Sequence, residues 1–142
     1  IHHHGRPISW TTRSIGQKQH KKYISASPDQ EAYPHKHSLF GIDFCRNVVI
    51  AVEGPLDAVR IGPGAAATYG LQYTAKQLAI LAQYPVRCIC FDHHPEAQAT
   101  ADRLCNDLAP WPGETHRIEL DAGDPGSASD REVAQVRKHF LE

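Results

Sequence analysis

The chain has 142 residues, of which 41% are hydrophobic and 22% charged, values typical of one globular domain with its own core. It has no apolar run of membrane length and no signal-peptide pattern, so we expect a cytoplasmic protein that does not contact a membrane. The four cysteines lack CxxC spacing, which argues against both a zinc ribbon and a disulfide framework.

Charge is unevenly distributed along the chain, although the formal net charge is only −1. The first 28 residues contain five basic side chains and no acidic one: Arg6, Arg13, Lys18, Lys21 and Lys22. All sixteen acidic residues therefore lie in the rest of the chain. A basic segment joined to an acidic body favours a protein that holds phosphates on one side and cations on the other.

The N-terminal part is predicted to form a small antiparallel β element. Apolar and polar residues alternate over 6–14, and a second strand is expected near 22–25. Residues 26–38 contain two prolines and are expected to form a loop. We therefore divide the chain into a basic β element with its linker, residues 1–47, and an α/β domain, residues 48–142.

The most informative stretch is VVIAVEGPLD, residues 48–57. Its five apolar residues predict a buried strand that ends at Glu53, and Gly54-Pro55 predicts a turn into a helix. Ligands bind at the carboxyl ends of the strands in open α/β sheets, so Glu53 is a site candidate. The alternative is that Glu53 is a solvated loop residue and Asp57 an acid favoured by the helix dipole.

Strand and helix patterns then alternate to the end of the chain. Further strands are expected over 65–68, 86–91 and 116–120, and helices are expected to begin near residues 56, 74, 95 and 129. Thr74 and Ser129 are suitable N-caps. This alternation predicts a Rossmann-like α/β fold, in which a mainly parallel four-stranded sheet has helices on both faces.

Three of the four predicted strands end in a carboxylate: Glu53, Asp92 and Asp121, with Asp124 close behind the last. The carboxyl ends of parallel strands share one edge of the sheet, so these acids should converge. Clustered carboxylates repel one another unless a cation lies among them, and oxygen ligands suit Mg²⁺. The pattern therefore predicts a metal site that could orient phosphates.

The order of motifs over residues 48–124 resembles the TOPRIM domain of DnaG-type primases. EGPLDA at 53–58 resembles the EGxxD block of that family, and Tyr69-Gly70 resembles the glycine block that closes the second strand. FDHHPEAQATADRL at 91–104 resembles the FDxDxAGxxAxxRL block, and LDAGDP at 120–125 resembles the segment that ends in Asp-Pro.

The N-terminal part extends the resemblance to primases in particular. Arg13, Lys22-Tyr23-Ile24 and Leu39-Phe40-Gly41 resemble the lead-in of bacterial and phage primase cores, which topoisomerases lack. The resemblance implies that a basic stretch contacts nucleotide or template phosphates: Arg13, Lys18, Lys21, Lys22 and Tyr23. It implies further that Gly54 and Gly70 form the turns that shape the site.

The resemblance also assigns roles to the acids. Glu53 would be the general acid/base or a metal ligand, Asp92 a metal ligand, and Asp124 or, less directly, Asp121 a further ligand. His94 stands where the family has the second aspartate of its DxD motif. Imidazole is a poor ligand for Mg²⁺ but is accepted by Mn²⁺, so the expected cofactor is Mg²⁺ with Mn²⁺ as the alternative.

The implied function is metal-dependent nucleotidyl transfer: synthesis of RNA primers on single-stranded DNA from nucleoside triphosphates. The resemblance implies that the chain acts within a larger replication protein, with a replicative helicase as a further partner, and that the isolated chain does not prime. Two alternatives use the same fold: nuclease or topoisomerase chemistry, and a catalytically inactive nucleic-acid-binding TOPRIM domain. A less favoured alternative is a DHH-type phosphoesterase, suggested by Asp92-His93-His94.

Overall fold

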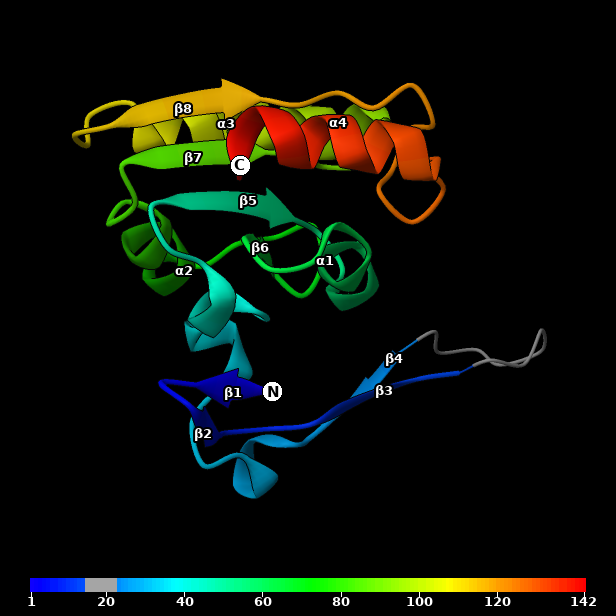
Figure 1. The fold of residues 1–142 in the computed structure, drawn as a ribbon. Coiled ribbons are helices and arrows are strands. Elements are labelled where there is room, and N and C mark those ends of the chain that lie inside the picture. Colours follow the sequence, from blue (N-terminus) through cyan, green and yellow to red (C-terminus); the bar gives the residue numbers. More distant parts are fainter. Residues whose placement is uncertain (15–22) are drawn as a thin grey trace.

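A four-stranded parallel sheet forms the centre of the molecule in the computed structural model, which describes residues 1–14 and 23–142 (Figure 1). Its strands are β5 (Val48–Val52), β6 (Ala65–Ala67), β7 (Val86–Ile89) and β8 (Glu114–Arg117). They lie in the order β6-β5-β7-β8, and every neighbouring pair is parallel. The predicted parallel sheet is confirmed.

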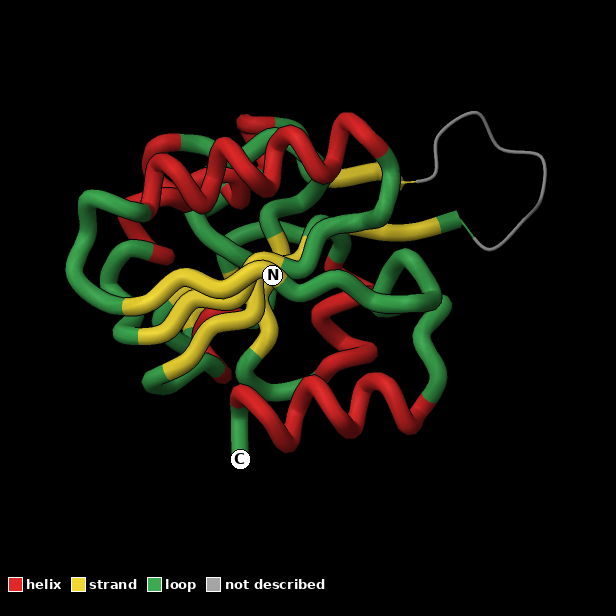
Figure 2. The backbone as a smooth tube through the Cα atoms, turned by 90° about the horizontal axis from the view of Figure 1, so that it is seen from above, coloured by secondary structure: helices red, strands yellow, loops and turns green. Residues whose placement is uncertain are grey.

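Helices cover both faces of the sheet, as Figure 2 shows. They are α1 (Pro55–Ile61), α2 (Ala75–Leu81), α3 (Pro95–Leu108) and α4 (Asp130–Phe140). Successive side chains of a strand point to opposite faces. Val49 and Ala51 are therefore buried in one cluster with residues of α2 and α3, whereas Ile50 and Val52 are buried with residues of α1 and α4. The predicted two-sided covering is confirmed.

The helices begin where local sequence signals place them. Pro55 occupies the first turn of α1, where its missing N–H costs no hydrogen bond. Thr74 caps α2 by accepting from the Gln77 amide, and Ser129 caps α4 by accepting from the Glu132 amide. Both predicted N-caps are confirmed.

The N-terminal part forms two hairpins, where one strand was expected over residues 6–14. The strands are β1 (His2–His3), β2 (Arg6–Pro7), β3 (Thr11–Arg13) and β4 (Tyr23–Ser25), and β1 pairs with β2 and β3 with β4. The expected strand is divided because its two parts pair with different strands, and Pro7 has no N–H with which to extend the first ladder. His4 and Gly5, both at positive φ, turn the chain between β1 and β2. The antiparallel pairing of β3 with β4 is confirmed.

Residues 26–45, predicted as a loop and an apolar lead-in, contain three short 3₁₀ helices. They are η1 (Pro28–Gln30), η2 (His35–His37) and η3 (Ile42–Phe44). Leu39 and Ile42 are buried against the sheet, and Phe40 forms a β-bridge with Ala67. The division of the chain at residue 47 stays a prediction.

Strand β8 begins and ends earlier than the predicted 116–120. It ends at Arg117 because its neighbour β7 ends at Ile89, so the ladder has no further partner beyond the bond from Ile118 N to Ile89 O. Ile118 and Leu120 remain buried on the α4 side, but Asp121 does not follow directly on the strand. Within residues 1–14 and 23–142, every helix is too short or too polar to cross a membrane.

Gln77 connects three segments behind the sheet edge, and we expect its loss to destabilise the protein. Its buried amide nitrogen donates to Ser38 O (2.9 Å) and Thr68 O (3.0 Å), and its oxygen accepts from the Thr74 amide. Gln77→Leu removes these hydrogen bonds and leaves the Ser38 carbonyl and the Thr74 amide without their partner, while Thr68 O keeps only Lys36 Nζ; this should lower the free energy of unfolding by about 3 kcal/mol in urea titrations. Gln83→Leu, at an exposed position, should change it by less than about 0.5 kcal/mol. Equal effects of the two variants would contradict this role for Gln77.

Candidate metal centre

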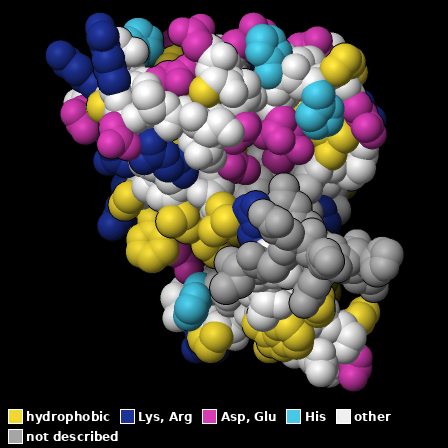
Figure 3. All heavy atoms as spheres, turned by 90° about the vertical axis from the view of Figure 1, so that its right-hand side faces the viewer, with side chains coloured by type: hydrophobic (Ala, Val, Ile, Leu, Met, Phe, Trp, Pro, Cys, Tyr) yellow, Lys and Arg dark blue, Asp and Glu magenta, His cyan; other side chains and the backbone are white. Residues whose placement is uncertain are grey.

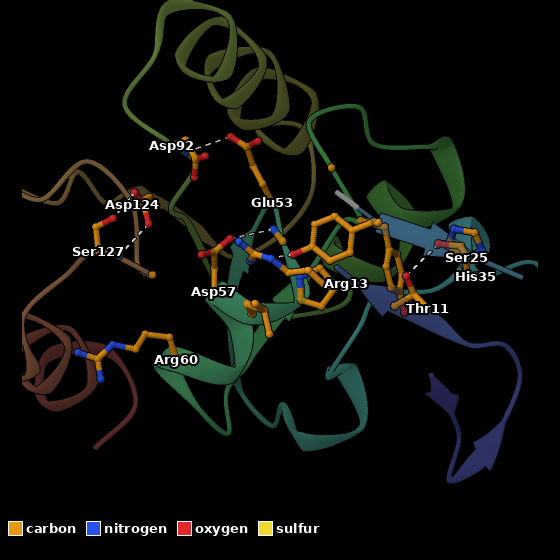
Figure 4. Close-up of a pocket in the computed structure, with 17 residues that line it drawn as sticks. Thr11, Arg13, Ser25, His35, Glu53, Asp57, Arg60, Asp92, Asp124 and Ser127 are labelled. Atoms are coloured by element: carbon orange, nitrogen blue, oxygen red, sulfur yellow. Dashed lines mark hydrogen bonds between the residues drawn. The ribbon is translucent and has the colours of Figure 1, made fainter. Parts of the chain in front are cut away.

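A pocket of about 670 Å³ opens at the carboxyl ends of β5 and β7. Four acids line one side of it: Glu53, Asp57, Asp92 and Asp124. Residues of the β3–β4 hairpin, among them Arg13 and Tyr23, line another side (Figure 4). Figure 3 looks onto this edge of the molecule and shows acidic side chains gathered near the middle of the face. The acids thus share one pocket with the N-terminal β element.

Glu53 and Asp92, which line this pocket, form a close group with the exposed side chain of His94. Each offers a ligand atom, and the three atoms lie within 4.8 Å of one another. They come together because β5 and β7 pair in register, so the residues that follow the two strands emerge side by side. Glu53 Oε1 accepts a hydrogen bond from the Asp92 amide at 3.0 Å, which links the two strand ends.

The electrostatics of the group favour a bound cation. Burial raises the pKa of Glu53, and the nearby charges of Asp92 and Asp57 raise it further, while the Asp92 amide and His94 act in the opposite direction. Burial and the charges of Asp92 and Asp124 likewise raise the pKa of Asp57. The structure thus brings together carboxylates that destabilise one another's charged forms. Two carboxylates and an imidazole are a donor set that fits a divalent metal ion.

Asp57 lies in the pocket, although sequence reasoning placed it only at a helix N-terminus. Its Oδ2 accepts from the Gly54 amide at 3.1 Å, so it fixes the turn as well as adding charge. The sequence does contain a signal for this position: Asp57 is the second acid of the EGPLDA block and falls in the first turn of the helix that follows Glu53.

Gly54 and Gly70, the two glycines predicted to shape the site, both occupy positions that disfavour a side chain, for different reasons. A Cβ atom on Gly54 would lie 2.7 Å from Asp57 Oδ2, too close for a side chain there without moving the carboxylate. Gly70 has φ +112°, a conformation that side chains disfavour, and follows Tyr69, which itself has φ +62°. Both positions line the pocket.

The remaining two acids differ in position. Asp124 lines the pocket but lies outside the three-residue group, and its two oxygens accept from the Ser127 amide (2.8 Å) and hydroxyl (2.9 Å). Asp121 is exposed and does not line the pocket; its amide donates to Glu132 Oε1 at 2.6 Å. Of the two candidate third acids, the structure therefore brings only Asp124 to the site.

Of the basic stretch predicted to contact phosphates, Arg13 and Tyr23 line the pocket. The Arg13 guanidinium lies 5.5 Å from the centre of the Tyr23 ring, and its Nη1 donates to the Tyr23 hydroxyl at 3.3 Å. The tyrosine thus orients the guanidinium, which lines the same pocket as the acids. Lys18, Lys21 and Lys22, which the sequence places in the same stretch, lie outside the described residues.

The parallel sheet of this strand order, with helices on both faces, forms an α/β fold. Solved primase structures share it. A primase from Aquifex aeolicus (zinc-binding and RNA polymerase domains) matches with TM-score 0.69 and 22% identity over 96% of this chain and 34% of the other. A DNA primase domain from Pseudomonas aeruginosa matches with TM-score 0.70 and 20% identity over 96% and 44%.

The DnaG catalytic core matches equally well, with TM-score 0.71 and 20% identity over 96% of this chain and 49% of the other. The resemblance to the primase core is therefore confirmed at the level of the fold. The chain spans between 34 and 49% of the length of these three structures. No protein-family model matches the chain. No curated protein matches it either.

Proposed function

We propose that the chain is the TOPRIM part of a primase-like protein and that it binds a divalent metal ion together with a nucleoside triphosphate for nucleotidyl transfer. The observation that carries the proposal is the meeting of Glu53, Asp92 and His94 at the ends of two neighbouring parallel strands. The shared fold of three primase structures supports it. In this proposal the whole protein makes RNA primers on single-stranded DNA.

In this proposal, different residues bind the metal ion and the phosphate. A divalent ion held by Glu53, Asp92 and His94 would polarise a phosphoryl oxygen and neutralise charge on the triphosphate. Glu53 Oε1 is engaged by the Asp92 amide, so Oε2 is the atom available to a ligand or to the proton of an attacking hydroxyl. Arg13, held by Tyr23, supplies positive charge for a phosphate on the opposite side of the pocket.

Metal-dependent nucleotide binding tests this proposal. In calorimetric titrations the protein should bind ATP when Mn²⁺ is present and at least about 100-fold more weakly in EDTA, because the ion links the acids to the triphosphate. Asp92→Asn should weaken metal-dependent ATP binding to the same degree. Glu96→Gln removes an exposed charge from the first turn of α3 and should have little effect. Equal ATP affinity with and without metal would count against the proposed function.

Binding of single-stranded DNA tests the role of the basic segment. Replacing Lys21 and Lys22 by glutamine should weaken binding of a fluorescent oligothymidylate, since each phosphate contact releases counterions. The slope of log affinity against log salt should fall by about 0.7 for each lost contact on a single strand. Anisotropy titrations at several salt concentrations measure it. An unchanged slope would mean that the two lysines do not contact DNA.

A further inference from the structure

A second polar arrangement faces the same pocket without belonging to the acidic group. The side chain of Glu31 is only 6% exposed, yet it accepts hydrogen bonds from Ser9 Oγ at 2.6 Å, from the His35 amide at 3.3 Å and from His35 Nδ1. Burial opposes ionisation, but these hydrogen bonds prevail and lower the pKa of Glu31. Glu31 is therefore a buried carboxylate that accepts hydrogen bonds from both Ser9 and His35.

The ring of His35 is held in place from several sides. It lies on η2 and packs edge-on against the ring of Tyr69, with centroids 5.0 Å apart and planes at 84°. The next residue, Lys36, donates from Nζ to the carbonyl oxygens of Thr68, Tyr69 and Gln72. These contacts tie η2 to the chain that follows β6, so the ring has one well-defined orientation.

The hydrogen bond to Glu31 decides which polar atom His35 presents to the pocket. A carboxylate can only accept, so His35 Nδ1 must carry a proton toward Glu31. His35 lines the pocket, and Nε2 is then the one ring nitrogen that it can offer there. In the neutral ring Nε2 is a hydrogen-bond acceptor.

The surroundings of His35 suit a sugar better than a phosphate. In Figure 4 His35 lies together with Thr11 and Ser25, away from Asp92 and Asp124 across the pocket. Thr11 Oγ1 and Ser25 Oγ lie 3.0 Å apart and are neutral donors and acceptors. A wall of two hydroxyls, an aromatic ring and an imidazole acceptor matches the hydroxyl groups of a ribose.

We propose that Nε2 of His35 accepts a hydrogen bond from the 2′-hydroxyl of the ribose of the bound nucleotide, and that Glu31 is the residue that positions the His35 ring. This inference rests on the proposed nucleotide site. It assigns to His35 the discrimination between ribonucleotides and deoxynucleotides, because a site built to pair with a hydroxyl loses a partner when that hydroxyl is missing.

The test compares ATP with 2′-deoxy-ATP and 3′-deoxy-ATP in calorimetric titrations with excess Mn²⁺. The wild-type protein should bind ATP about fivefold more tightly than the analogue that lacks the contacted hydroxyl, the effect of one neutral hydrogen bond. His35→Ala should bind ATP as weakly as that analogue and should bind the analogue itself unchanged. His37→Ala is the matched control: it lies on the same 3₁₀ helix, its ring packs against Tyr33, and it does not line this pocket.

A second readout needs no change at His35. In ¹⁵N spectra of the wild-type imidazole, Nδ1 should be protonated, and ATP should shift the Nε2 signal more than the discriminated analogue does. Glu31→Gln should lower the ratio between the ATP and analogue affinities.

Each contrary outcome is distinct. If His35→Ala lost affinity equally for all three nucleotides, His35 would contact a phosphate, and the proposal would be overturned. The proposal would also be overturned if His35→Ala lost no affinity for ATP and ATP left the Nε2 signal of the wild type unshifted. Failure of the wild-type protein to bind ATP with metal would remove the proposed function and this inference together.

Discussion

Glu53→Gln should abolish metal-dependent binding and at the same time stabilise the metal-free protein. The substitution keeps the shape of the side chain and an oxygen that can accept from the Asp92 amide. It removes one of the three ligand groups, and loss of a ligand should weaken Mn²⁺ binding by at least about 100-fold in calorimetry. In the primase-like protein proposed above, Glu53→Gln should also abolish primer synthesis.

The stability gain follows from the raised pKa of Glu53, whose first cause is burial. When the pKa of a carboxyl group is higher in the folded state, protonation of that group stabilises the folded protein. This stabilisation is fully present below the ordinary pKa of about 4.5 and is lost as the pH rises through the folded-state pKa. Glutamine has no such loss, so in EDTA the variant should melt above the wild type at pH 7 but not at pH 4.

Thermal unfolding across this pH range measures the effect, with Glu96→Gln at an exposed position as the control. Adding Mn²⁺ should raise the melting temperature of the wild type and leave that of Glu53→Gln unchanged. If Glu53→Gln instead melted below the wild type at neutral pH, burial and the neighbouring acids would not destabilise the charged form of Glu53 as its raised pKa implies.

His94→Asp should raise the affinity for Mg²⁺ by more than tenfold and reduce the preference for Mn²⁺. The new carboxylate adds an oxygen ligand and a negative charge; even at the dielectric constant of water, its attraction for a dication 4 Å away is about 2 kcal/mol. The fold should survive, since His94 caps α3 by accepting from the Ala97 amide, and aspartate is equally good at that position.

Calorimetric titration of both metals into both proteins decides the matter. His93→Asp is the matched control, because it adds the same charge one residue away at a side chain outside the ligand group. Tight Mg²⁺ binding by the wild type, unimproved by His94→Asp, would show that His94 does not ligate. Asp124, which already lines the pocket, would then be the acid that completes the site.

Local patterns predicted the sheet and the convergence of Glu53 with Asp92, because short apolar runs, Gly-Pro and N-cap residues act within a few positions of one another. They could not predict which of Asp121 and Asp124 lies at the pocket. That depends on where β8 loses its partner, which is set by the length of a different strand. The Glu31–His35 pair was missed for a similar reason, since its environment comes from Ser9 and Tyr69, distant along the chain.

The strand order also explains why the pocket lies at the carboxyl ends of β5 and β7. From β5 the chain crosses to β6 on one side and then returns to β7 on the other, so β5 and β7 mark a topological switch point. The segments leaving these two strands lead into α1 and α3, which cover opposite faces, and a crevice opens between them. The crevice is thus a property of the chain path, whereas the acids decide only what it binds. Variants that lose every ligand should keep the cavity, so an inactive descendant of this fold could still hold a nucleotide or a strand of DNA there.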